Sequence, residues 1–144
     1  MKLVETVTTF KTKELIESML DVAKVQGQRS MEMQKTLTPS WDFAVHVNLG
    51  RQCGHSTALR DILKDEHNHL LIVHNQCRVK HYHPTIYQPS HINAKSISTN
   101  ECAMRGIVAD TLVFESVRVE EAREFYNRYG YMIRPKAILL VGCY

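Results

Sequence analysis

The sequence has few cysteines and no closely spaced cysteine pair. Its 144 residues contain four of them, Cys53, Cys77, Cys102 and Cys143, spread along the chain. Without a CxxC pair there is no common structural-zinc pattern, and without a dense set there is no disulfide framework. The cysteines therefore predict reduced thiols, and the compartment that keeps thiols reduced is the cytoplasm.

Long hydrophobic runs are also missing. The first ten residues have no apolar core of the length that a secretory signal needs. No segment approaches the ~20 apolar residues that span a bilayer, so we expect no membrane partner. The sequence also lacks a large excess of positive or negative charge: the formal net charge is +3, with a sequence pI near 8.7. Such mild basicity permits a nucleic-acid or phosphate partner without requiring one.

What is present is an ordinary globular composition, with 44% hydrophobic and 23% charged residues. A chain of this length buries enough apolar surface to fold without a metal or a disulfide, and it leaves no room for a second core. We therefore expect one domain over residues 1–144. Within it, residues 1–40 form an N-terminal helical segment and a connector that contains Pro39.

Apolar periodicity predicts strands that alternate with helices. Helices are expected at 12–35, with Gly27 as an interruption, at 58–64, and at 119–129, with Gly130 as the C-cap. Strands are expected at 41–49, 69–74, 110–117 and 137–141, and a weaker pattern at 94–98 leaves a further short strand open. Strands that read as continuous apolar runs are buried on both faces. The pattern predicts a three-layer α/β domain with a mostly parallel sheet flanked by helices.

One loop in this pattern has the composition of a phosphate-binding loop. Residues 48–57 read NLGRQCGHST and lie between an expected buried strand and an expected amphipathic helix. Small residues allow successive backbone N–H groups to point into one concavity, and the following helix adds the positive end of its dipole. Ser56 stands where the hydroxyl of such a loop holds Mg²⁺.

The segment GRQCGHSTAL at 50–59 resembles the GRQxGK[ST]TAL phosphate loop of phage large-terminase ATPases and related helicase-type motors. Two later segments resemble further motifs of that family and follow in the same order. The first, RGIVADTLVFES at 105–116, resembles its acidic metal-binding motif. KAILLVGC at 136–143 is similar to the next strand, which ends in a Gly-Thr motif, with Cys143 in place of threonine. The resemblance covers 48–143, roughly two-thirds of the chain.

This resemblance implies a P-loop NTPase-like fold and ATP or ADP with Mg²⁺ as cofactor. Glu115 then matches the aspartate associated with Mg²⁺, and together with Ser56 it forms the implied metal site. The nucleotide-binding residues that the resemblance implies are Gly50, Arg51, Gln52, Gly54, His55, Ser56, Thr57 and Glu115. If the protein is phage-encoded, its compartment is the host cytoplasm.

The departures from the family fall on the catalytic positions. His55 replaces the lysine that places a permanent charge near the β- and γ-phosphates. Ser116 replaces the catalytic glutamate, and a hydroxyl cannot polarise water as a carboxylate does. We therefore expect a degenerate nucleotide- or phosphate-binding domain with weak or no NTPase activity. An active small NTPase or kinase is the least favoured alternative.

Other interpretations stay open at this point. The chain could be an interaction or inhibitor protein that reuses a motor fold to bind a host protein, a phage protein or nucleic acid. The loop could be a plain tight turn, His55 a solvent-facing side chain and Glu115 a polar cap on the sheet.

A second cluster of candidate residues lies between the expected strands at 69–74 and 94–98. Cys77, His81, His83 and His91 invite a zinc interpretation, but their spacing favours a histidine-rich surface loop. In the same region, Arg78, Lys80, Tyr82 and Tyr87 are candidates to stack on or clamp nucleic acid.

Overall fold

A computed structural model describes residues 2–48, 55–66, 68–82 and 92–144, with side chains described from residue 11 onward. Within these ranges the helices are α1 (Lys2–Gln34), a 3-10 helix η1 (Trp41–Phe43), α2 (His55–Leu63), α3 (Gln76–Lys80), α4 (Glu101–Met104) and α5 (Val119–Ile133). The strands are β1 (Val45–Val47), β2 (His69–Val73), β3 (Ala94–Ser96), β4 (Thr111–Glu115) and β5 (Ala137–Val141).

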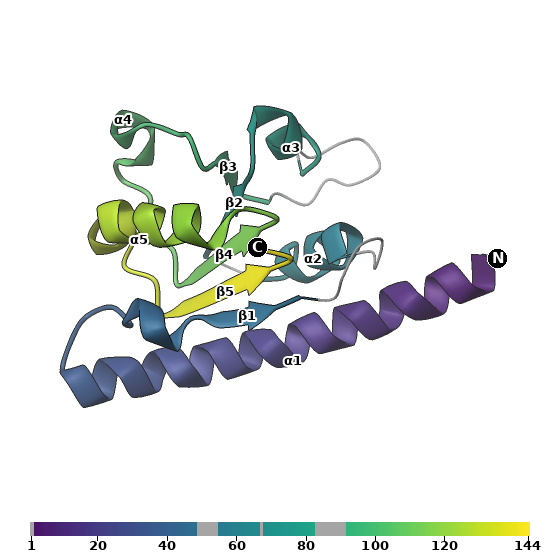
Figure 1. Cartoon of the computed structure of the whole chain (residues 1–144), viewed down its shortest axis with the longest axis horizontal. Helices are drawn as coiled ribbons and strands as arrows, with labels where there is room; N and C mark the ends of the chain where they lie inside the picture. The colour runs from purple at the N-terminus through teal and green to yellow at the C-terminus, as the bar shows by residue number, and fades with distance from the viewer. Residues whose placement is uncertain (1, 49–54, 67, 83–91) are drawn as a thin grey trace.

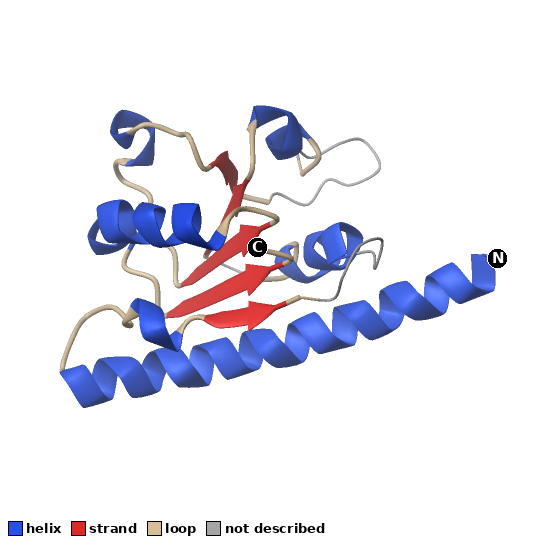
Figure 2. Cartoon of the chain, in the orientation of Figure 1, coloured by secondary structure: helices blue, strands red, loops and turns tan. Residues whose placement is uncertain are grey.

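The five strands form one sheet in the order β1-β5-β4-β2-β3, and every neighbouring pair is parallel. Figure 2 shows β1, β5 and β4 pointing to the same edge. At that edge the register pairs Val47 with Val141, Glu115 with Val141, and Val73 with Glu115. The predicted parallel sheet is therefore confirmed, and it brings the last residues of four strands together.

Helices cover both faces of the sheet, so the domain has three layers (Figure 1). Successive side chains of a strand point to opposite faces. Odd-numbered residues pack in one core with side chains of α1 and α2, among them Val47, Val73, Val113 and Leu139. Even-numbered residues pack in a second core with side chains of α5, among them Leu70, Leu112, Phe114 and Ile138. Burial on both faces explains why the central strands read as unbroken apolar runs.

Helix α1 is longer than predicted and is not interrupted at Gly27. It runs from Lys2 to Gln34, and its N-terminal part extends past the sheet (Figure 1). Gly27 is buried inside the helix, where an added Cβ would lie 1.8 Å from the carbonyl oxygen of Lys136. The glycine is therefore a point of close approach between α1 and the residue before β5, not a break.

Several other boundaries differ from the predictions. The expected strand at 41–49 divides into η1 and the short strand β1. Gly130 is not a C-cap, because α5 continues to Ile133 and ends at Arg134 in the left-handed conformation. The pattern did not predict α3 and α4. None of the helices in the described ranges combines the length and the apolar character that crossing a membrane requires.

Candidate functional site

The predicted site residues that the structure describes lie at the carboxyl edge of the sheet. His55 and Ser56 begin α2, and Glu115 is the last residue of β4. In open α/β sheets this edge is where ligands bind. Thr57 is exposed in the first turn of α2. The other predicted residues of the phosphate loop, Gly50, Arg51, Gln52 and Gly54, lie outside the described residues.

Glu115 is the centre of the arrangement and is fully buried. Its Oε1 accepts a hydrogen bond from Ser56 Oγ at 2.6 Å and another from Arg78 Nη2 at 2.7 Å. Its Oε2 accepts a hydrogen bond from the Tyr82 hydroxyl. Glu115 has an odd number in β4, so its side chain points to the sheet face that α2 covers. It is a buried, fully bonded carboxylate rather than a polar cap facing solvent.

The environment of Glu115 keeps it ionised. Burial alone raises the pKa of a carboxyl group, but hydrogen bonds from His55, Ser56, Tyr82 and Arg78 outweigh that effect and lower the pKa to about 2. The site therefore carries a permanent negative charge. The guanidinium of Arg78 carries the opposite charge beside it. Burial lowers the pKa of Arg78, but the hydrogen bond and the charge of Glu115 raise this pKa by more, so the pKa is raised overall.

His55 does not face solvent; it packs between the ends of β4 and β5. Its Nε2 lies 3.2 Å from Ser116 Oγ and 3.5 Å from Glu115 Oε1, and 19% of its side chain is exposed. Gly142 makes room for the ring, because an added Cβ would lie 3.1 Å from His55 Cε1. Ser116 has a φ of 55°, a left-handed conformation that non-glycine residues adopt chiefly where a structure imposes it.

Tyr82 corrects part of the nucleic-acid interpretation. It is 1% exposed and therefore cannot stack on a base, whereas Arg78 is bonded to Ser56 and Glu115 and its side chain is still 37% exposed. Both follow β2, and polar residues after any parallel strand reach the same edge of the sheet. That rule was the available signal for them. Tyr87 lies outside the described residues.

Arg60 of α2 fixes the position of this region. Its Nη2 donates a hydrogen bond to the carbonyl of His81 at 2.7 Å, and its guanidinium carbon lies 5.7 Å from the centre of the Tyr82 ring. Burial, followed by the positive charges of Arg60 and Arg78, lowers the pKa of His81. Arg60 and Arg78 therefore place two positive charges near His81, next to the buried Glu115.

The predicted Mg²⁺ ligands meet, but a positively charged side chain is already bonded to both of them. Ser56 Oγ and Glu115 Oε1 are adjacent, as the resemblance implies. Arg78 Nη2, however, donates a hydrogen bond to Ser56 Oγ and lies 2.7 Å from Glu115 Oε1. Mg²⁺ needs near-octahedral oxygen ligands at 2.0–2.1 Å. The residues present, as they are arranged, do not fit the metal.

The remaining candidates from the sequence do not form a site in the part of the chain that is described. There, no three His, Cys, Asp or Glu side chains are placed to hold a metal, and Cys77 is exposed. His83 and His91 lie outside the described residues. Cys143 is buried, its thiol donates to the carbonyl of Phe114, and burial raises its pKa to about 11. Cys143 is therefore a protonated packing residue and not a nucleophile.

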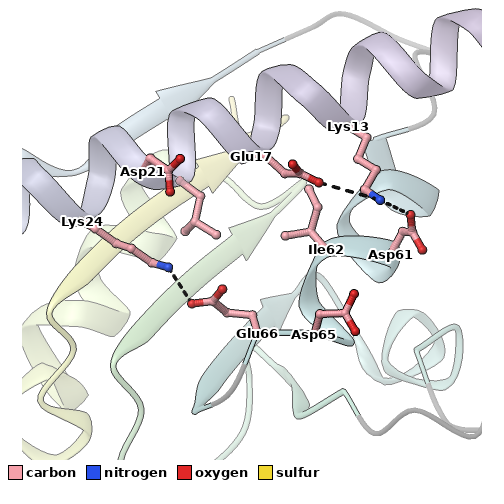
Figure 3. Close-up of a pocket in the computed structure, with 9 residues that line it drawn as sticks. Lys13, Glu17, Asp21, Lys24, Asp61, Ile62, Asp65 and Glu66 are labelled. Carbon is pink, nitrogen blue, oxygen red and sulfur yellow. Dashed lines mark ion pairs between the residues drawn. The ribbon is translucent and has the colours of Figure 1, made fainter.

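A groove of about 260 Å³ between α1 and α2 is separate from this cluster (Figure 3). Carboxylates and two lysines line it, and they pair with one another: Lys13 lies 2.5 Å from Asp61 and Lys24 lies 2.8 Å from Glu66. These ion pairs join α1 to α2 and to the segment that follows α2. The groove contains none of the predicted site residues.

The cluster brings together the guanidinium of Arg78, the imidazole of His55 and the first turn of α2, which are groups that can interact with an anion. Glu115 provides the carboxylate among the described residues of the cluster, and both of its oxygens already accept hydrogen bonds.

No protein-family model, curated protein or solved structure matches this chain.

Proposed function

We propose that this chain is a degenerate P-loop-type domain that binds a nucleotide or another phosphate compound and hydrolyses it weakly or not at all. The observation that carries the proposal is the 2.6 Å hydrogen bond from Ser56 to Glu115, which are 59 residues apart. The resemblance assigns these residues to the phosphate loop and to the acidic motif. Their contact at the carboxyl edge is what a phosphate site built from those two motifs requires.

The position of α2 supports phosphate binding independently of the lysine that is missing. Ser56 lies in the first turn of a nine-residue helix that follows the glycine-containing loop. Helix N-termini attract phosphate through their backbone N–H groups and through the helix dipole. Arg78 lies beside that turn, where its guanidinium adds donors that suit phosphate oxygens, and His55 is the first residue of the turn.

Calorimetric titration of ATP and ADP into the wild type and into His55→Lys tests this function. A lysine at position 55 adds a charged donor where the family has one, so we expect His55→Lys to bind about tenfold more tightly, equivalent to about 1.4 kcal/mol. Asn127→Lys adds the same charge to an exposed position of α5, on the other face of the sheet, and should bind as the wild type does. Absence of binding by all three proteins at millimolar nucleotide would overturn the proposal.

A second candidate is a protein-interaction module, and one feature of α1 favours it. Leu15, Val22, Val25 and Met33 are apolar and 42%, 40%, 58% and 73% exposed. Exposed apolar side chains gathered on one element are typical of an interaction surface. This function is supported if a host protein co-purifies with the wild type but not with Val25→Glu, and if nucleotide does not raise the melting temperature.

A further inference from the structure

We infer that Arg78 takes the place of the divalent cation, so that the site binds phosphate groups without a metal. The phosphate part of this inference rests on the proposed function; the exclusion of the metal does not. The starting observation is a triangle of three side chains from α2, α3 and β4. Arg78 Nη2 bonds to Ser56 Oγ and to Glu115 Oε1, and those two oxygens are 2.6 Å apart.

The first step of the argument concerns space. Ser56 Oγ and Glu115 Oε1 are the two protein oxygens to which the resemblance assigns Mg²⁺. A nitrogen 2.7 Å from the carboxylate oxygen occupies the side of Glu115 from which a metal would approach. The second carboxylate oxygen is closed as well, because it accepts the hydroxyl of Tyr82, which is 1% exposed. A metal would have to displace a charged donor or a buried one.

The second step concerns charge. Arg78 is always protonated, because Glu115 raises its pKa further above the ordinary range than burial lowers it. The fixed positive charge pairs with the one buried carboxylate of the triangle, and it repels a divalent cation at hydrogen-bonding distance. The same charge serves an anionic ligand. A metal-dependent site uses Mg²⁺ to neutralise phosphate oxygens, and a guanidinium supplies positive charge and planar donors for the same purpose.

The third step concerns reach. A guanidinium has five N–H donors, and its bonds to Ser56 and Glu115 both use Nη2. The Arg78 side chain is 37% exposed, whereas Glu115 is fully buried. One end of the guanidinium is thus held by the protein while the side chain remains accessible from the carboxyl edge. The ligand chemistry that fits is a di- or triphosphate in its metal-free form.

Binding of Mn²⁺ to the protein alone, followed by electron paramagnetic resonance of the free ion, tests the exclusion of the metal. We expect wild type and Glu115→Gln to bind Mn²⁺ equally weakly, because Arg78 blocks access to Ser56 Oγ and Glu115 Oε1. Arg78→Ala should gain a site at least about tenfold tighter, and Arg78→Ala combined with Glu115→Gln should lose it. Comparison with the double variant removes any contribution from the carboxylates between α1 and α2.

Two matched variants show whether a gained Mn²⁺ site comes from the loss of the cation at position 78 or from a general loss of positive charge. Lys80→Ala removes an exposed positive charge from the same helix and should gain no Mn²⁺ site. Arg78→Lys keeps a cation at the position and should also gain none. Thermal unfolding checks that each variant is folded. A Mn²⁺ site in the wild type that Glu115→Gln abolishes, or no gain in folded Arg78→Ala, would overturn the inference.

A nucleotide arm tests the ligand. The wild type should bind ADP with the same affinity in EDTA as in Mg²⁺, within about threefold, whereas Arg78→Ala should need the metal. A loss of tenfold or more in EDTA for the wild type contradicts the inference. If the wild type binds no nucleotide under either condition, the proposed function fails and the phosphate part of the inference fails with it. The Mn²⁺ measurement still decides whether Arg78 excludes the metal.

Discussion

At Glu115, a buried charge is stabilised by four side chains from two parts of the chain, the start of α2 and the region of α3. An isolated carboxylate away from water costs several kcal/mol, which is why buried carboxyl groups normally take up a proton. Here Ser56, Arg78 and Tyr82 donate hydrogen bonds, and His55 Nε2 lies 3.5 Å from Oε1. The ionised form is therefore favoured in the folded state, and its pKa is about 2 against 4.5 for the free group.

This depressed pKa predicts that the domain loses stability in acid. A group with a lowered folded-state pKa contributes stability above its unfolded value, and that contribution disappears as the pH falls from about 4.5 toward 2. A difference of this size corresponds to about 3 kcal/mol of unfolding free energy. Chemical denaturation of wild type and Glu115→Gln between pH 2 and 7 measures it. Glu115→Gln should be less stable at neutral pH and should show a flatter acid limb.

The control for this measurement is Glu124→Gln, which removes a carboxylate from an exposed position of α5. It should leave the pH dependence close to that of the wild type. Parallel acid limbs for wild type and Glu115→Gln would mean that Glu115 titrates alike in the folded and unfolded chains. The hydrogen bonds described here would then not hold its charge.

At the scale of elements, strands buried on both faces gave the most accurate predictions. The strand at 137–141 matches β5, and those at 69–74 and 110–117 contain β2 and β4. Continuous apolar runs bounded by polar residues mark such strands clearly. The helices α3 and α4 span five and four residues, too few to establish a helical period. Their positions depend on tertiary contacts and on the asparagine caps Asn75 and Asn100.

Gly27 shows why a residue type can mislead when its surroundings are unknown. Glycine disfavours helix, so the sequence alone predicted an interruption. In the folded domain α1 lies so close to the carbonyl of Lys136 that no side chain fits at position 27. A long-range contact, invisible in the local pattern, explains both the glycine and the uninterrupted helix.

We predict that Gly27→Ala destabilises the domain although alanine favours helix by about 0.8–1 kcal/mol. An added Cβ would lie 1.8 Å from Lys136 O, which is a backbone atom, so α1 must shift away from β5. Overpacking of this kind costs about 1–3 kcal/mol or more. The free energy of unfolding by urea measures the effect.

Ser18→Ala is the matched control for this helix. Ser18 is exposed on α1, so the substitution raises helix propensity without a steric conflict. It should leave stability unchanged or raise it slightly. If Gly27→Ala is as stable as Ser18→Ala, the close approach of α1 to Lys136 does not persist in solution.

At the scale of the whole molecule, the site depends on strand order. Ser56 and Glu115 are 59 residues apart, and Arg78 and Glu115 are 37 apart. The sequence predicted the first pair because two motifs of one family name them. It named Arg78 and Tyr82 as nucleic-acid contacts and did not predict their bonds to Glu115, because those bonds depend on β2 lying beside β4. Side-chain spacing cannot indicate such a neighbourhood.

The same arrangement limits the chemistry of the molecule, and we predict negligible ATP hydrolysis. Activation of water needs a carboxylate near the γ-phosphate, and position 116 holds a serine whose hydroxyl lies 3.2 Å from His55 Nε2. The neighbouring carboxylate, Glu115, is buried with both oxygens accepting hydrogen bonds, and its pKa of about 2 makes it a weak base. Arg78 Nη2 lies 2.7 Å from Glu115 Oε1, the oxygen to which the resemblance assigns the metal. His55→Lys restores one charged donor and supplies neither a base nor a metal site, so it too should remain inactive.

Steady-state phosphate release by wild type, His55→Lys and Glu115→Gln should stay at the level of buffer. Turnover of about 1–100 per second in the wild type, abolished in Glu115→Gln, would show that this edge of the sheet is catalytic after all.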